Sequence, residues 1–263
     1  MKKRKGSEDV ILAFQHLSLP IFLAYSDIRQ RYRRSSLGPF WITISTGVMI
    51  ACIGLIFGRL FKAPMSEFLP FLSSGLIIWG FISTVLTEAT QSFVSSEQII
   101  KQLPLPLFTH ILRMVTRNII IFAHNLVILP IVYFCVGKSI GTEFFLFIPG
   151  MFLLLLNLLW MSLLLGIACT RFRDLVQIVG SVLQIFFYVT PIIWVPNLLP
   201  QRTSMMILDP NPVYHMIQLV RAPLIGELPS MLDWGYCLVL MLIGSFFTIK
   251  LFNTYKGKIA YWL

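Results

Sequence analysis

The sequence predicts an all-α membrane protein with six transmembrane helices, and three observations lead to this fold class. Of the 263 residues 57% are hydrophobic and only 12% are charged, and the mean hydropathy is +0.81, whereas soluble domains are about a quarter charged. Six apolar runs approach the ~20 residues that a helix needs to cross a bilayer. In the resulting topology 16 of the 21 Lys and Arg residues lie inside, as the positive-inside rule expects. Both termini are therefore predicted to be cytosolic.

Several functional classes are disfavoured by what the sequence lacks. The net charge of +10 could suggest nucleic acid, but the charges follow the membrane topology, so we expect no nucleic-acid partner. The cysteines and histidines are not spaced as metal ligands, so no metal site is expected. There is no phosphate-binding loop and no Ser/His/Asp arrangement. The chain is predicted not to be an enzyme, and any energy for transport has to come from another chain.

Residues 1–36 are predicted to form a cytosolic segment with an amphipathic interface helix, and residues 37–263 a six-span membrane domain. Between about Ile11 and Arg34, several large residues recur at helical spacing and share one face, while arginines occupy the other faces. Such a helix lies in the interface with its arginines on anionic headgroups. Amphipathicity leaves two interpretations open, a topological anchor and a gate beside a channel mouth. The residues on the shared face are Ile21, Tyr25, Ile28 and Tyr32.

The six spans follow in order after Leu37-Gly38-Pro39, which ends the interface helix. In the first span, Gly47, Ala51, Gly54 and Gly58 place small residues on one side, which fits packing within the chain or a dimer seam. The predicted spans run from about Phe40 to Phe61, Leu69 to Phe93, Leu112 to Val136, Phe144 to Ala168, Leu175 to Val195 and Leu232 to Leu251.

Charged residues at the inner ends of the spans are candidates for contacts with partners. Glu88, near the inner end of the second span, is either a functional carboxylate or the partner of an arginine. The connection after it contains a short predicted helix that ends at Leu103-Pro104-Leu105-Pro106, because prolines break helices. That connection is either a plain linker or a helix that receives a partner. The turn at 170–174 has two arginines and an aspartate, which suits a second contact.

The fifth span carries a polar stripe. Gln177, Ser181, Gln184 and Tyr188 fall at i, i+4, i+7 and i+11 and so share one face, which should look at protein or water, not lipid. Phe186 and Phe187 add aromatic surface, for which packing and sugar contact both remain open. The outer segment 197–229 is divided by prolines into short helices, and residues 213–224 are predicted to be re-entrant between spans five and six.

Five stretches carry a resemblance to a known family, and they occur in the family's order over almost the whole chain. They are residues 27–41 (DIRQRYRRSSLGPFW), 97–106 (EQIIKQLPLP), 171–175 (RFRDL), 186–192 (FFYVTPI) and Asn211-Pro212 with Arg221. Together they resemble the permease subunits of type-2 ABC exporters for bacterial surface polysaccharides, the O-antigen export family. The resemblance implies a homodimer with two copies of a separate ABC ATPase, which would bind ATP and Mg²⁺. No cofactor is expected on this chain.

The resemblance also implies roles for particular residues and a place in the bacterial inner membrane. The substrate would be a lipid-linked polysaccharide, most like lipopolysaccharide O-antigen. Contact with the ATPase would involve Glu97, Gln98 and Lys101, with Arg171, Phe172, Arg173 and Asp174 as a smaller second contact. The gate helix, expected from Tyr25 to Leu37, would include Tyr25, Ile28, Arg29, Tyr32 and Arg33. The channel lining is predicted to be Trp41, Gln177, Ser181, Gln184, Phe186, Phe187 and Tyr188.

Other functions remain open alongside this expectation. A capsule or teichoic acid exporter, or a drug or lipid exporter of the same architecture, would have the same pattern. A membrane enzyme acting on lipid-linked sugars would need paired carboxylates, whereas Asp174, Asp209 and Asp233 are isolated in the sequence. A membrane scaffold without transport activity would have little use for an intramembrane polar stripe.

Overall fold

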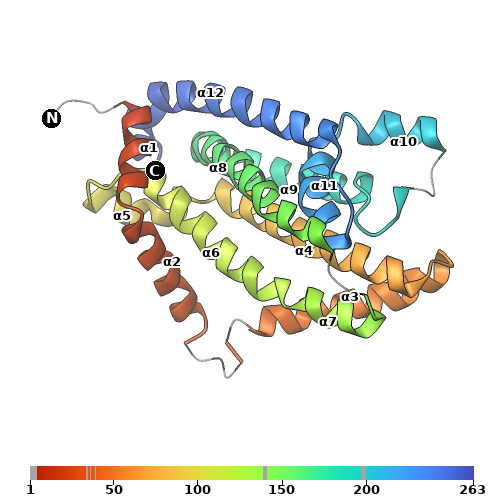
Figure 1. The fold of residues 1–263 in the computed structure, drawn as a ribbon. Helices are drawn as coiled ribbons and strands as arrows, with labels where there is room; N and C mark the ends of the chain where they lie inside the picture. Colours follow the sequence, from red (N-terminus) through yellow and green to blue (C-terminus); the bar gives the residue numbers. More distant parts are fainter. Residues whose placement is uncertain (1–4, 34, 36, 39, 139–140, 197–199) are drawn as a thin grey trace.

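The computed structural model describes residues 5–33, 35, 37–38, 40–138, 141–196 and 200–263. Every regular element within these ranges is a helix (Figure 1), which confirms the predicted all-α class. Several features of the sequence prediction lie outside the described residues. They are the charged start at 1–4, Arg34, the helix-breaking Pro39, the domain boundary at residue 36 and the start of the outer segment at 197–199.

Five helices of the described chain are long and apolar enough to cross a membrane, or six if the bent pair α1–α2 is one span. The chain is therefore a multi-pass membrane protein. The five correspond to the predicted spans one to four and six. They are α3 (Phe40–Leu60), α4 (Met65–Thr90), α6 (Phe108–Leu126) with α7 (Ile128–Val136), η2 (Thr142–Leu146) with α8 (Phe147–Arg171), and α12 (Met231–Trp262).

The predicted fifth span is shorter than expected. Helix α9 (Leu175–Val189) has 15 residues, or about 22 Å at 1.5 Å per residue, against a hydrocarbon core of about 30 Å. It ends before Pro191, and Thr190 is extended (φ −84°, ψ 135°), as expected for a residue that precedes proline. The prediction of a helix to Val195 was wrong because it followed the apolar run through Pro191.

The predicted interface helix is two helices, α1 (Gly6–Gln15) and α2 (Ser18–Arg31), with a bend of 72° between them. Pro20 lies in the first turn of α2, where a missing N–H is tolerated but a continuous helix from α1 is not. The helix also ends earlier than predicted. Tyr32 and Arg33 therefore follow α2 and are not part of a gate helix that reaches Leu37.

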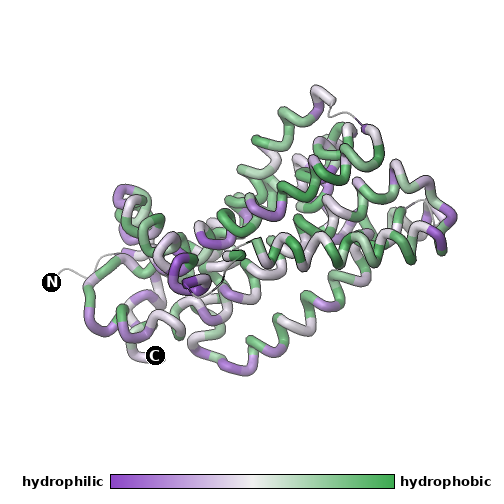
Figure 2. Tube along the Cα trace, turned by 90° about the horizontal axis from the view of Figure 1, so that it is seen from below, coloured by the Kyte–Doolittle hydropathy of each residue, from purple (hydrophilic) through white to green (hydrophobic). Residues whose placement is uncertain are grey.

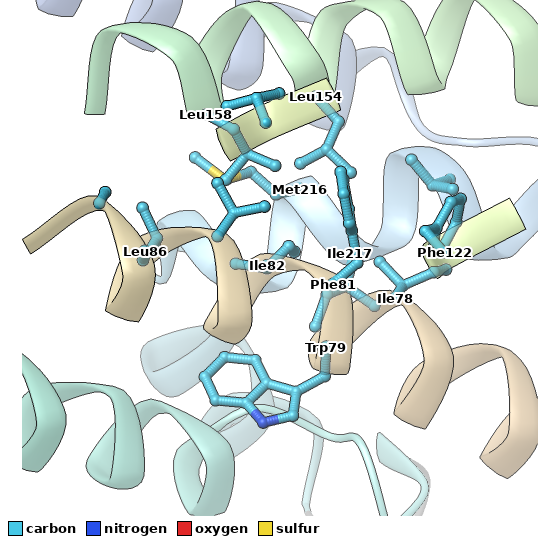
Figure 3. Close-up of a cluster of buried hydrophobic side chains, with 14 of the residues drawn as sticks. Ile78, Trp79, Phe81, Ile82, Leu86, Phe122, Leu154, Leu158, Met216 and Ile217 are labelled. Carbon is cyan, nitrogen blue, oxygen red and sulfur yellow. The ribbon is translucent and has the colours of Figure 1, made fainter. Parts of the chain in front are cut away.

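Helix α4 is the centre of the molecule. In its most apolar window 72% of the residues are buried, compared with 17% for α3 and for α12. It packs against α3, α6, α7, α8, α9 and α11 (Pro212–Ile225). Figure 3 shows Ile78, Phe81 and Ile82 packed among side chains of α6, α8 and α11, while Trp79 points to the other side.

The glycines of α3 help it to approach α4. A Cβ on Gly54 would lie 2.7 Å from Leu69, and one on Gly58 would lie 2.5 Å from Met65. At both positions the absence of a Cβ gives room to a side chain of α4, which is one of the two uses expected for the small residues. A Cβ on Gly47 would meet nothing within 4 Å. No other helix of the described chain therefore packs closely on this end of the small-residue stripe.

The two ends of the molecule differ in which short elements they carry. Helix α1, η1 (Val94–Ser96), α5 (Glu97–Gln102) and the last turns of α12 lie together at one end, which we call the inner end (Figure 1). Helix α10 (Gln201–Leu208) and the turn from α3 to α4 lie at the opposite end. Figure 2 shows hydrophilic residues gathered around the inner end and apolar stretches along the long helices.

Candidate transport path and coupling surface

The polar face of α9 is uncovered in the single chain. Gln177, Ser181, Gln184 and Tyr188 are all exposed, and the Tyr188 side chain is 65% exposed. Helix α9 packs with its opposite side on α4 and α8. Amides and a phenol that faced lipid would lack hydrogen-bond partners, at a cost of several kcal/mol each. This face therefore requires water or another protein surface.

The aromatic residues beside the stripe have a different environment. Phe186 and Phe187 are half-buried and pack against the core, and the ring centroid of Phe187 is 5.8 Å from that of Trp79. Trp41 on α3 is 59% exposed. A lining role for these three residues stays a prediction, and for Phe186 and Phe187 the contacts favour packing.

The end of α9 is held by α11. Asn211 caps α11 by accepting hydrogen bonds from the N–H groups of Val213 (3.0 Å) and Tyr214 (3.1 Å), as Asn often does at this position. Its Nδ2 donates to Oγ1 of Thr190 at 2.9 Å. Asn211 thus connects the start of α11 to the residue at which α9 ends.

Arg221 provides a second connection at the same place. Its guanidinium, which is fully buried, donates to the carbonyl of Pro191 at 2.7 Å and twice to Oε1 of Gln218. It also lies 4.1 Å from the ring centroid of Phe71, a cation–π distance. Burial lowers the pKa of Arg221 to about 10, so the side chain remains charged at neutral pH. Arg221 therefore fixes the irregular segment that follows α9.

The two segments predicted to contact an ATPase both lie at the inner end. In α5, Lys101 donates to Glu97 at 2.6 Å, an i,i+4 pair that is largely exposed. At the other segment, residues 171–174 are all exposed. The Arg171 guanidinium carbon lies 5.3 Å from the ring centroid of Trp262 near the end of α12. The C-terminal turns of α12, which also pack near α5, therefore bring the two segments to the same end.

Asp9 ties three helices together next to α5. Its carboxylate is buried and accepts hydrogen bonds from the N–H groups of Leu107 (3.2 Å) and Phe108 (3.0 Å), at the start of α6. Lys256 of α12 lies 2.8 Å from the same carboxylate. A negative charge at the first turn of a helix is stabilising because N–H groups there lack partners. Asp9 thus fixes the start of α6 just after the proline-rich connection.

An ionic cluster joins α2 to α4 and α6. Asp27 of α2 accepts from Arg113 at 2.5 and 2.7 Å and from Arg117 at 3.1 Å. Glu88 of α4 accepts from Arg117 at 2.7 Å and from Asn118 at 2.6 Å. The four charged side chains are only 14–22% exposed. Glu88 is therefore the partner of an arginine, one of the two roles expected for it.

A polar cavity of about 260 Å³ lies beside this cluster. It is lined by Glu88, Arg113 and Arg117 and by serines between α4 and α5. Water in such a polar cavity would solvate the arginines and lower the cost of keeping them charged.

The predicted gate residues differ in their exposure. Ile28 of α2 is buried against the chain, whereas Tyr25, Arg29 and Arg33 are exposed and Tyr32 is half-buried.

Comparison with known proteins shows the family of this multi-pass chain. The ABC-2 type transporter family matches residues 21–225. The chain belongs to the ABC-2 type transporter family. Two O-antigen export system permease proteins RfbA of Klebsiella pneumoniae are 24% and 25% identical, each over 92% of this chain and 93% of the relative. An RfbA of Myxococcus xanthus is 23% identical over 69% of the chain and 70% of its own length.

This membership makes the chain a membrane subunit of an ABC-2 transporter, a kind of protein that pairs with an ABC ATPase subunit. Across the described part of this ABC-2 permease, no group of three or more His, Cys, Asp or Glu residues could hold a metal ion.

Several residues of these sites were not identified from the sequence of the ABC-2 permease. Asp27, Arg113 and Arg117 were not assigned as partners, and Asp9 was not recognised as a cap. The sequence does show charged residues inside or beside apolar runs, which marks them as residues that need a partner. It does not show which residue of opposite charge is that partner. The contacts of Asn211 with Thr190 could not be predicted from spacing, although Asn before Pro is typical of a helix start.

The ABC-2 permease also contains a buried ion pair between α11 and α12. Nδ1 of His215 lies 2.7 Å from Asp233, and Nε2 lies 2.8 Å from the carbonyl oxygen of Asp209. A carbonyl only accepts hydrogen bonds. Asp233 already accepts from the N–H and hydroxyl of Ser230, which favours its ionised form. Both ring nitrogens of His215 therefore donate, and the ring is an imidazolium stacked on Tyr236 at 4.3 Å.

The stability of the ABC-2 permease should therefore depend on pH through His215. Burial alone lowers the pKa of His215, but hydrogen bonds to Asp233 and Asp209 and the charges of these residues outweigh it, so the pKa is raised above 6.5. A raised pKa means that the stabilisation is complete below about pH 6.5 and is lost as the pH rises through the raised value. Melting curves in detergent between pH 6 and 9 should show this loss, and His215→Gln should remove it. The matched control is His16→Gln, an exposed histidine; an equal pH slope in wild type and His215→Gln would contradict the assignment.

Proposed function

We propose that this chain is the permease subunit of an ATP-driven exporter that moves a lipid-linked surface polysaccharide, most like O-antigen, across the bacterial inner membrane. It works as a homodimer with two copies of a separate ATPase, which binds ATP and Mg²⁺. The uncovered polar face of α9 is the observation that carries this proposal. A second copy of the chain would enclose that face in a corridor between two protomers.

The chemistry of the face suits a sugar polymer. Amide and hydroxyl groups can bond the hydroxyl rims of sugar rings, and the Tyr188 ring can cover an apolar sugar face. The residues are spaced over three helical turns, so many weak contacts are available in place of one tight site. A moving polymer needs such contacts, because binding has to be weak enough for release. The names of the Klebsiella and Myxococcus relatives support O-antigen as the polymer.

The inner end provides the surface for the ATPase in this proposal. Gln98 and Lys101 of α5 and Arg173 and Asp174 after α8 are exposed there. Helix α2, held by the ionic cluster on α4 and α6, would lie at the inner mouth of the corridor as its gate, with exposed arginines toward anionic headgroups.

Two measurements test the proposed function together. The chain is purified with an affinity tag from cells that express its chromosomal neighbours, and a copurifying nucleotide-hydrolysing subunit is expected. Deletion of the chain should remove polysaccharide from the cell surface. Copurification with a normal cell surface and altered drug sensitivity would reject the polysaccharide and favour a drug exporter. Absence of any ATPase under conditions that retain the dimer would reject the whole proposal.

A further inference from the structure

A groove between α8 and α12 at the inner end has an apolar floor and a cationic rim. Leu164 and Ile167 of α8 and Leu251 of α12 line the floor, and Arg171, Tyr255 and Trp262 stand at the rim. The groove encloses about 170 Å³. We call it the inner groove.

Arg171 at the rim, and Lys258 next to the rim residue Tyr255, both have aromatic neighbours. The Arg171 guanidinium carbon lies 5.1 Å from the Phe172 ring centroid and 5.3 Å from that of Trp262, and Lys258 Nζ lies 5.7 Å from that of Tyr255. Within the described residues, neither Arg171 nor Lys258 forms an ion pair or donates a side-chain hydrogen bond. Aromatic rings cover guanidinium faces and leave N–H edges for an anionic acceptor.

The position of the groove along α12 matches the membrane surface. Helix α12 has 32 residues, about 48 Å at 1.5 Å per residue, which exceeds the hydrocarbon core of about 30 Å. The predicted sixth span ends at Leu251, so the last turns, which carry Lys256 and Lys258, extend beyond the hydrocarbon core to the level of the headgroups. Tyr and Trp are enriched at this level because one part of each ring system is apolar and the other polar.

We propose that the inner groove binds an anionic phospholipid of the inner leaflet. One acyl chain lies on the floor formed by Leu164, Ile167 and Leu251, and the headgroup phosphate is bound by the N–H edge of Arg171, with Lys258 adding positive charge. A zwitterionic lipid would have the same chain contacts but less attraction to the rim. The bound lipid fixes the turn between α8 and α9 against α12. Arg171 is then a lipid-binding residue, and the proposed ATPase contact falls to Arg173 and Asp174.

The test compares lipid retention by the purified full-length chain. Native mass spectrometry measures binding of phosphatidylglycerol and of phosphatidylcholine with identical acyl chains. Arg171→Gln should weaken phosphatidylglycerol binding about fivefold, as expected for loss of one cation near an anionic surface, and should leave phosphatidylcholine unchanged. Arg171→Lys should keep most of the preference. The matched control is Arg173→Gln, an exposed arginine that does not line the groove.

Four results would overturn the proposal. One is equal binding of the two lipids, and a second is an equal effect of Arg171→Gln and Arg173→Gln. Another is full displacement of the lipid by millimolar inorganic phosphate, which would indicate a site for free phosphate. The fourth is loss of the lipid when a partner ATPase binds, which would indicate a protein-docking groove. If Arg171→Gln does not fold, the salt dependence of lipid binding to the wild-type chain tests the proposal. Binding of phosphatidylglycerol should weaken as the salt concentration rises, and binding of phosphatidylcholine should not. Phosphatidylglycerol binding that does not change with salt would reject the contact with the rim.

Discussion

Replacement of Arg221 by Met is expected to abolish most export and to lower the stability of the chain. Methionine fills a similar volume, but it cannot donate to the Pro191 carbonyl or to Gln218, which Arg221 reaches at 2.7 Å. Each buried acceptor left without a donor costs about 1–3 kcal/mol. The loss occurs at the point where α9 ends, so the polar face of α9 would no longer be held at a fixed height relative to α4. Export and melting temperature of the purified chain measure the two effects.

Two variants bracket the expected result for Arg221. Arg221→Lys retains one donor and should keep part of both stability and export. Arg202→Met changes another arginine of the outer segment, exposed on α10, and should have little effect on either. If Arg221→Met exports normally, the hydrogen bond to Pro191 does not position α9, and the role assigned to α11 is wrong.

Disruption of the ionic cluster should release α2 from the helices beneath it. Asp27→Asn leaves Arg113 and Arg117 with one carboxylate, Glu88, between them. Loss of one member of a largely buried pair typically costs about 3–5 kcal/mol, because the remaining charge stays uncompensated. We expect increased proteolysis in the segment after α2 and a leak or loss of export. The helix proposed as the gate loses the charged contacts of Asp27 and keeps the longer contact of 3.9 Å between Arg31 and Glu88.

A double-mutant cycle separates this interaction from general damage. The coupling free energy between Asp27 and Arg113 should be about 2 kcal/mol, with Asp27→Asn and Arg113→Gln as the single variants. The exposed pair Glu97–Lys101 is the matched control and should couple by no more than about 0.5 kcal/mol. Equal coupling in the two pairs would show that the buried cluster has no special role in holding α2.

The sequence predicted the long helices well because the bilayer imposes one simple pattern on them. Apolar runs of about 20 residues predicted α3, α4, α6–α7 and α8 to within a few residues of their ends. The start of α12 was also predicted, but its end was wrong, because the helix continues past Leu251 to Trp262. The same reasoning failed where local chain chemistry outweighs hydropathy. Helix α9 ends before Pro191 although the apolar run continues, and the bend before Pro20 divides the predicted interface helix.

The contacts within the site were less predictable than the helices. Gln177, Ser181, Gln184 and Tyr188 could be placed on one face because helical spacing determines it. The partner of Asp27 could not be found in the same way, since Arg113 lies 86 residues away along the chain and several other arginines were available. Tertiary packing alone selects between such partners.

The central claim is that the polar face of α9 borders water inside an assembled transporter. The most direct test introduces Gln184→Cys into a chain in which the exposed Cys52 and Cys135 are replaced by Ala. The remaining cysteines, Cys169 and Cys237, are buried and should react poorly. Labelling uses a charged, membrane-impermeant maleimide on the complex in vesicles, with Ile185→Cys as the neighbouring control. We predict fast labelling at position 184, slowed by the polymer substrate, and little labelling at position 185. If position 184 reacts with apolar maleimides but not with the charged one, the polar face of α9 does not border water.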